Sequence, residues 1–120
     1  MKPIQPEERK VANIFDDSAF TNYDETGASG TSFIQLNPNA RQDVGFYIYR
    51  MAPGSQSTPH RHGGAEEFLV VQGELIDNDG TVYRAGDVVW LDGDTEHTSH
   101  TKTGCIVAVY SEAEEHPPAS

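Results

Sequence analysis

The chain has 120 residues with 19 acidic and 8 basic side chains, so its formal charge is −11 at neutral pH. This length favours a single domain, and the charge disfavours binding to nucleic acid or to an anionic membrane surface. There is no run of 18 or more apolar residues to span a membrane and no apolar secretory signal at the start, so we expect a cytoplasmic protein. A single cysteine, Cys105, excludes an internal disulfide, whereas five histidines are many for so short a chain.

The two ends of the chain differ in composition from its centre. Residues 1–30 are rich in Asp, Ser, Thr, Asn and Gly with scattered apolar side chains, and we expect an extended arm there. Residues 112–120 carry three glutamates and two prolines, a pattern that predicts a solvated tail. This leaves residues 31–111 for the folded domain.

The central region alternates between strand-forming runs and turns. Runs rich in β-branched and aromatic residues are separated by Gly, Pro, Asn and Asp, and none shows a sustained helical period. This pattern predicts an all-β sandwich or barrel. We expect its strands over residues 31–36, 44–51, 66–72, 74–76, 81–83, 88–91, 96–101 and 105–110.

Three of the histidines and one glutamate have the spacing of a metal site. His60 and His62 are two residues apart, so an extended chain carries both imidazoles on one face. Glu66 has the same parity and follows a Gly-Gly turn, and His97 lies in a separate predicted strand. Imidazole and carboxylate groups together suit a divalent transition metal. The alternative is a set of surface or core histidines, but the combined spacing favours one metal per chain.

These residues also carry a resemblance to a known family. The order Gly54, His60, His62, Glu66 and Gly73 resembles the first motif of the cupin superfamily, G(X)5HXH(X)3,4E(X)6G, at every fixed position. The resemblance implies an all-β fold of the cupin type, a double-stranded β-helix that forms a single-domain jelly-roll barrel.

The second cupin motif, G(X)5PXG(X)2H(X)3N, is matched in part. Gly86 and His97 keep the required separation, but Asp92, Asp94 and Thr101 stand in place of the proline, the glycine and the asparagine. The resemblance therefore depends more on the first motif than on the second.

A closer resemblance is to the cupin domain of ChrR-type anti-sigma factors. It is carried by the string HRHGGAEEFLVVQGELIDNDGTVYRAGDVVW and the later Gly-Cys pair. In that family the metal ligands match His60, His62, Glu66 and His97, which implies Fe2+ or Zn2+, with Ni2+ and Mn2+ as alternatives. ChrR proteins also carry an N-terminal zinc-binding helical domain that holds the sigma factor. This chain lacks the cysteines of that domain and the room for it, so we expect no sigma-factor partner.

The resemblance leaves three functions open. Small cupins also resemble acetylacetone-cleaving and cysteine-type dioxygenases, which bind non-haem iron, so the first is a mononuclear metal dioxygenase that acts on a small molecule. The second is a ChrR-like module that binds or senses a ligand without catalysis. The third is a metal-assisted isomerase or lyase. The sequence identifies no catalytic residue beyond the metal ligands.

Strand parity assigns the remaining candidates. Glu67 also fits the looser spacing of the first motif, but Glu66 shares a face with Phe68, so we expect Glu66 at the metal, Glu67 outside and Phe68 in the pocket. His100 and His116 are expected to face solvent.

The resemblance also bears on assembly. Small cupins often pair by exchanging an N-terminal strand, and the apolar positions within residues 1–30 fit such an arm, so a homodimer is expected. We expect Cys105 to be buried and Arg61, between the two histidines, to pair with an acidic neighbour.

Overall fold

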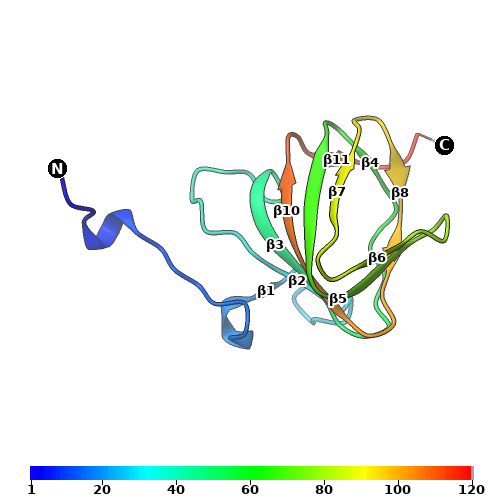
Figure 1. Ribbon diagram of the computed structural model, residues 1–120, viewed down its shortest axis with the longest axis horizontal. Helices are drawn as coiled ribbons and strands as arrows, with labels where there is room; N and C mark the ends of the chain where they lie inside the picture. Colours follow the sequence, from blue (N-terminus) through cyan, green and yellow to red (C-terminus); the bar gives the residue numbers. More distant parts are fainter. Residues whose placement is uncertain (120) are drawn as a thin grey trace.

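A computed structural model describes residues 1–119 of the chain, and these form an all-β barrel with a long N-terminal arm (Figure 1). Two short 3₁₀ turns lie in the arm, η1 (Pro6–Glu8) and η2 (Asp17–Ala19). No helix within the described residues is long and apolar enough to cross a membrane. The strands are β1 (Thr21–Asn22), β2 (Thr31–Ile34), β3 (Gly45–Met51), β4 (His60–His62), β5 (Glu66–Asp77), β6 (Val82–Arg84), β7 (Val88–Leu91), β8 (Glu96–His97), β9 (Ser99–His100), β10 (Cys105–Ser111) and β11 (Glu115–His116).

The strands form two antiparallel sheets. The larger sheet has the order β1-β2-β3-β10-β5-β6, with β7 and β9 also paired to β5, and the smaller has the order β11-β4-β8. The strand β5 crosses the whole barrel, because its first residues pair with β7 and its last residues pair with β6 and β9 (Figure 1). The predicted all-β jelly-roll class is confirmed.

The core lies between the sheets and follows the alternation along β5. Glu66, Phe68 and Val70 are buried, whereas Glu67 and Leu69 are exposed, as the parity of the strand predicts. Further buried side chains come from β3 and β10, the neighbouring strands of the same sheet. The core cluster consists of Tyr47, Met51, Phe68, Val70, Leu75, Cys105, Val107 and Val109. The position of Cys105 in this cluster confirms the prediction of a buried thiol.

Several expected strand boundaries are wrong. The expected strand 31–36 ends at Ile34, the expected strand 96–101 is divided into β8 and β9, and the largest difference is at Gly73. The sequence suggests that Gly73 ends a strand, but β5 runs through it to Asp77. Gly73 has φ 76° beside a register shift in the pairing with β10, and a β-carbon there would overlap the carbonyl oxygen of Gly104. The glycine therefore permits a bulge that bends β5 from one side of the barrel to the other.

Both ends of the chain contact the barrel. Near the N-terminus, Asp17 pairs with Arg50 at 2.9 Å and the Arg50 guanidinium lies 3.8 Å from the centre of the Phe20 ring, so η2 is anchored on the barrel. Near the C-terminus, Glu115–His116 pair with β4 as the strand β11, where the sequence suggests a solvated tail. Ser120, which belongs to the same expected tail, lies outside the described residues.

Candidate metal centre

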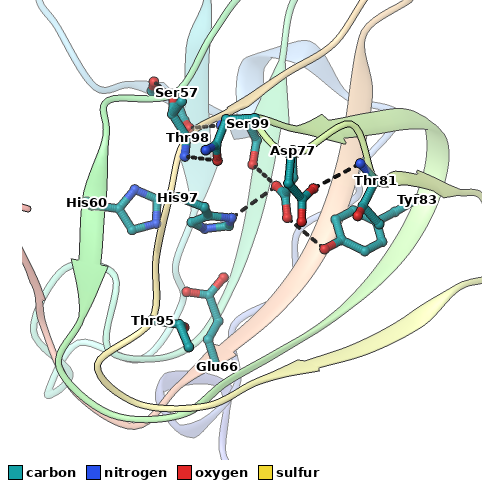
Figure 2. A network of polar contacts seen from close by, with 12 residues as sticks. Ser57, His60, Glu66, Asp77, Thr81, Tyr83, Thr95, His97, Thr98 and Ser99 are labelled. Atoms are coloured by element: carbon teal, nitrogen blue, oxygen red, sulfur yellow. Dashed lines mark hydrogen bonds and ion pairs between the residues drawn. The ribbon is translucent and has the colours of Figure 1, made fainter.

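Three histidine rings meet at one end of the barrel. His60 and His62 come from β4, and His97 comes from β8, where it is the direct cross-strand partner of His60. The ring centres are 4.6–5.0 Å apart, and one nitrogen from each ring lies within 4.8 Å of the others. Figure 2 shows His60 and His97 facing one another, with Glu66 beside them. The structure thus brings together the three histidines that the sequence selects.

A hydrogen-bond chain determines which nitrogen of His62 carries its proton. The Thr95 hydroxyl donates to the Asp92 carbonyl at 2.6 Å, so toward His62 Nδ1, at 2.9 Å, it can only accept. Nδ1 therefore carries the hydrogen, and in the neutral ring Nε2 presents a bare lone pair to the barrel interior. The turn that places Thr95 includes Asp94 at φ 65°, the position where the second cupin motif has glycine. Aspartate tolerates this left-handed conformation better than most residues.

The other two histidines are held in the same way. His60 Nδ1 lies 2.7 Å from the carbonyl oxygen of Thr58, and His97 Nδ1 lies 3.0 Å from Asp77 Oδ1. Both partners only accept when Asp77 is ionised, so each Nδ1 donates, and in the neutral ring each Nε2 keeps a lone pair. One nitrogen of each ring lies within 4.8 Å of the others, and an opposite ring nitrogen that donates a hydrogen bond is typical of metal-binding histidines.

Asp77 is the centre of a buried network beside the histidines. It accepts hydrogen bonds from Ser99 and Tyr83, both at 2.6 Å, in addition to the one from His97 (Figure 2). Burial opposes its ionisation, but these hydrogen bonds prevail and hold the pKa of Asp77 below its usual value. Burial likewise lowers the pKa of His97, yet the hydrogen bond and charge of Asp77 outweigh it and raise that pKa. The network therefore orients His97 and keeps a negative charge behind it.

Glu66 places a carboxylate beside the same histidines. Its Oε2 lies 3.2 Å from His62 Nε2, and its residue is 8% exposed. Within residues 1–119, these two atoms are buried without a hydrogen-bond partner, as is Ser111 Oγ. A lone pair and a carboxylate face to face repel each other unless a proton or a cation lies between them. The donor set of three imidazole nitrogens and one carboxylate therefore fits a divalent transition metal.

Sequence reasoning missed one group at the site, Glu115. Its Oε1 lies 3.5 Å from His60 Nε2, and His60, Glu66 and Glu115 form a second cluster with oxygen and nitrogen atoms within 4.8 Å of one another. Burial, together with the negative charges of Glu66 and Asp43, raises the pKa of Glu115 to about 7. Burial also lowers the pKa of His60, which favours its neutral ring.

A cavity of about 410 Å³ adjoins the histidines. Apolar side chains line one part of it, namely Phe68, Leu75, Val107 and Val109, while the phenols of Tyr23, Tyr47 and Tyr49 line another. Four carboxylates also border it, those of Asp24, Asp43, Glu66 and Glu115. Among residues 1–119, the lining includes no Arg or Lys side chain.

The remaining sequence candidates lie outside this site. His100 belongs to β9, where it pairs with β5, and His116 is exposed on β11. Arg61 points outward and forms an ion pair with Asp94 at 3.1 Å, which confirms the predicted acidic neighbour.

The fold and the histidine group together define a cupin. The family model described as the ChrR cupin-like domain matches residues 11–114, so the chain belongs to this family. A search of the curated proteins finds no match.

Solved structures share the fold at low sequence identity. An acetylacetone dioxygenase from Acinetobacter johnsonii superposes with a TM-score of 0.66 at 15% identity, over 84% of this chain and 72% of that chain. A chain of the complex between Rhodobacter sphaeroides SigE and the anti-sigma factor ChrR superposes with a TM-score of 0.65 at 22% identity, over 81% of this chain and 49% of that chain. The protein thus spans about half the length of that second relative. The polyketide cyclase RemF from Streptomyces resistomycificus gives a TM-score of 0.58 at 17% identity, over 73% of this chain and 70% of that chain.

Proposed function

We propose that the protein holds one divalent transition metal per chain through His60, His62, His97 and Glu66, and binds a small molecule beside it. The observation that carries the proposal is the convergence of three imidazole rings, each with Nδ1 engaged in a hydrogen bond, so that the neutral ring keeps a lone pair on Nε2. Fe2+ and Zn2+ are the first candidates because neutral imidazoles with one carboxylate suit both, and Ni2+ and Mn2+ are the alternatives.

Metal-dependent dioxygenase chemistry is the activity that we propose first. Structural similarity to an acetylacetone dioxygenase supports it, although at 15% identity that similarity concerns the fold. A bound Fe2+ would supply a Lewis acid and a source of electrons for oxygen. The protein's own part is to orient the ligand and exclude water, for which Phe68 and Val107 supply the apolar wall of the cavity.

The charges around the cavity indicate the class of small molecule. Four carboxylates border it, and two positive charges from a divalent ion offset only part of their charge. Asp43 keeps an oxygen 2.6 Å from the Tyr23 hydroxyl, which donates to it, so this carboxylate is held at the wall. We therefore propose an uncharged or positively charged ligand with an apolar body, in preference to a carboxylate or a phosphate.

Two other functions have specific support. Membership of the ChrR cupin-like family favours a sensing or ligand-binding module that holds a redox-inert metal such as Zn2+. Structural similarity to a polyketide cyclase favours a metal-assisted reaction without oxygen, in which the ion polarises an oxygen of the substrate.

Metal analysis of the purified protein tests the central proposal. We expect close to one transition metal per chain, a large loss of metal in His60→Ala and His97→Ala, and no loss in His100→Ala, which removes a histidine outside the cluster. If neither site substitution lowers the metal content, the proposed site is wrong. Oxygen uptake by the iron-loaded protein with acetylacetone or a small thiol would favour the dioxygenase, whereas a zinc-loaded protein that ligands stabilise without oxygen uptake would favour sensing.

We also propose a homodimer in which the arm of one copy packs on the barrel of the other. Within the arm, Val11 and Phe15 are 83% and 77% exposed, and the arm extends away from its own barrel (Figure 1). The outer face of the larger sheet presents apolar side chains. Phe46 lies opposite Tyr110 in the pairing of β3 with β10, and Trp90 lies opposite Glu67 in the pairing of β7 with β5. All three of these aromatic residues are more than half exposed. Burying two such surfaces against each other would stabilise a pair of chains.

A further inference from the structure

The strand β11 points Glu115 into the barrel. In its antiparallel pairing with β4, Glu115 lies opposite His62 and His116 lies opposite Arg61. Directly opposite residues of a strand pair project from the same face. Because His62 faces the interior and Arg61 faces solvent, Glu115 faces the histidines while His116 faces away.

Gly63 and Gly64 allow the backbone of residues 112–114, just before β11, to lie close to the chain that follows β4. The amide of Gly63 donates to the Glu114 carbonyl at 3.1 Å, and a β-carbon on Gly63 would overlap that same oxygen. A β-carbon on Gly64 would lie 3.0 Å from the β-carbon of Glu112, whose amide donates to Ala65. The glycines after β4 therefore make room for the last strand at backbone distance, so the position of Glu115 is built into the fold.

The carboxylate of Glu115 faces an atom that has no proton to give. His60 Nδ1 donates to Thr58, which leaves Nε2 as an acceptor 3.5 Å from Glu115 Oε1. The same relationship holds between His62 Nε2 and Glu66 Oε2 at 3.2 Å. Donor atoms about 2.1 Å from one ion lie about 3.0 Å apart when they occupy adjacent corners of an octahedron. The His62–Glu66 pair is close to that separation, and the His60–Glu115 pair, at 3.5 Å, needs only a small shift to reach it.

We infer that Glu115 is a further ligand of the metal, which makes the site one of three histidines and two carboxylates. This inference rests on the proposed metal centre and adds a donor that neither cupin motif contains. Five protein donors balance the charge of a divalent ion and leave one octahedral position for an exogenous ligand. A small molecule that binds through two atoms must then displace a protein donor, and Glu115 is the most exposed of the five, with 35% of its side-chain surface exposed.

The test compares Glu115→Gln with Glu114→Gln in the full chain loaded with Co2+. Glu114 is the adjacent carboxylate, and it pairs with Arg41 at the surface, so both variants remove the same charge from neighbouring positions. We expect Glu115→Gln to weaken Co2+ binding at least roughly tenfold in a chelator competition, since even residues behind the ligands contribute that much. We also expect its visible absorption to become more intense as the coordination number falls. Glu114→Gln should match the wild type in both.

Each other outcome has a separate meaning. If Glu115→Gln keeps the affinity and spectrum of the wild type, Glu115 is not a ligand and only this inference fails. That result is also expected if a protonated Glu115 merely donates a hydrogen bond to His60, because a glutamine amide can do the same. An equal loss of affinity in both variants would show an effect of overall charge and would overturn the inference. A wild-type protein that binds no Co2+, Zn2+ or Fe2+ would overturn the proposed function itself. Thermal melts of the metal-free variants check that they fold.

Discussion

Asp77 Oδ1 lies 3.0 Å from His97 Nδ1, and this contact joins the buried polar network to the metal centre. The carboxylate is held in turn by Ser99 and Tyr83, so its orientation does not depend on the histidine. His97 is thereby restricted to the tautomer that turns a lone pair toward His60 and His62. The precision of the site thus depends on a residue that does not itself reach the proposed metal.

Replacing Asp77 with Asn should weaken the metal centre without removing a ligand. The substitution keeps the size of the side chain but removes the negative charge beside His97. It also places the hydrogens of an amide near Ser99 and Tyr83, which donate to the carboxylate in the wild type. We expect the affinity for Zn2+ to fall roughly 10- to 100-fold, measured by competition with a chelator. Asp79→Asn, an exposed aspartate in the following turn, is the control and should leave the affinity unchanged. Equal affinities in wild type and Asp77→Asn would contradict the role given to this contact.

The charge of the cavity should select between two thiols of equal length. Cysteamine carries an ammonium group where 3-mercaptopropionate carries a carboxylate, so the two thiols share a two-carbon chain and end in opposite charges. We expect the Co2+-loaded protein to bind cysteamine roughly tenfold more tightly, because each carboxylate near the cavity attracts one probe and repels the other. The thiolate-to-cobalt absorption band reports the binding of each.

Asp43→Asn should reduce this preference, since it removes one cavity charge at an aspartate with φ 63°. Asp94→Asn is the matched control, because Asp94 has a similar φ of 65° but pairs with Arg61 at the surface. A preference for 3-mercaptopropionate, or equal effects of the two substitutions, would contradict the proposed ligand class.

Shortening the arm should separate the chains of the proposed dimer. Deletion of residues 1–15 removes the exposed apolar positions but keeps Asp17 and Phe20, which hold η2 on the barrel. We expect the mass measured by light scattering to halve, and the double substitution Val11→Ser/Phe15→Ser to act in the same direction without shortening the chain. Glu7→Ser/Lys10→Ser changes polar positions of the same arm and should leave the dimer intact. A dimer that survives the deletion would exclude exchange of the arm.

Cys105 should be an inert thiol at neutral pH. Burial raises its pKa to about 11, so the reactive thiolate is scarce, and its residue is only 4% exposed. We expect a disulfide reagent to modify the native protein at pH 8 far more slowly than the protein unfolded in guanidinium.

The same pKa shift predicts how stability depends on pH. The unfolded thiol ionises near its ordinary pKa of 9.0, before the folded one does, so the unfolded state binds fewer protons between pH 9 and 11. Stability contributed by the neutral thiol is therefore complete below pH 9 and is lost as the pH rises through this window. In denaturant titrations, the difference in the free energy of unfolding between the wild type and Cys105→Ala should therefore decrease as the pH rises from 9 to 11. A constant difference up to pH 11 would argue against a perturbed thiol.

Local patterns in the sequence account for the architecture and for the inner histidines. Alternation along residues 66–71 predicts which side chains of β5 face inward, and the two-residue spacing of His60 and His62 predicts their common face. These features depend on neighbours in the chain and so can be read without the fold.

Contacts between distant segments could not be predicted in the same way. Thr58 and Thr95, which determine the histidine tautomers, are ordinary loop residues until the backbone brings them beside the rings. Glu115 sits in a segment whose composition predicts solvation, and only its pairing with β4 turns it inward. The Gly63–Gly64 pair is a local signal of the pairing between β4 and β11, because glycines permit the close approach of another chain segment as well as a turn.

The proposed donors are divided unevenly between the two sheets. The histidines and Glu115 come from β4, β8 and β11 of the smaller sheet, whereas Glu66 begins β5 in the larger one. A bound ion would therefore link the two sheets, and Glu66 would be its ligand from the larger sheet. Removal of the ion should destabilise the smaller sheet first, so that the amide hydrogens of β4, β8 and β11 exchange with solvent faster. The amide hydrogens of β3 and β10, which pair along seven residues, should keep their protection.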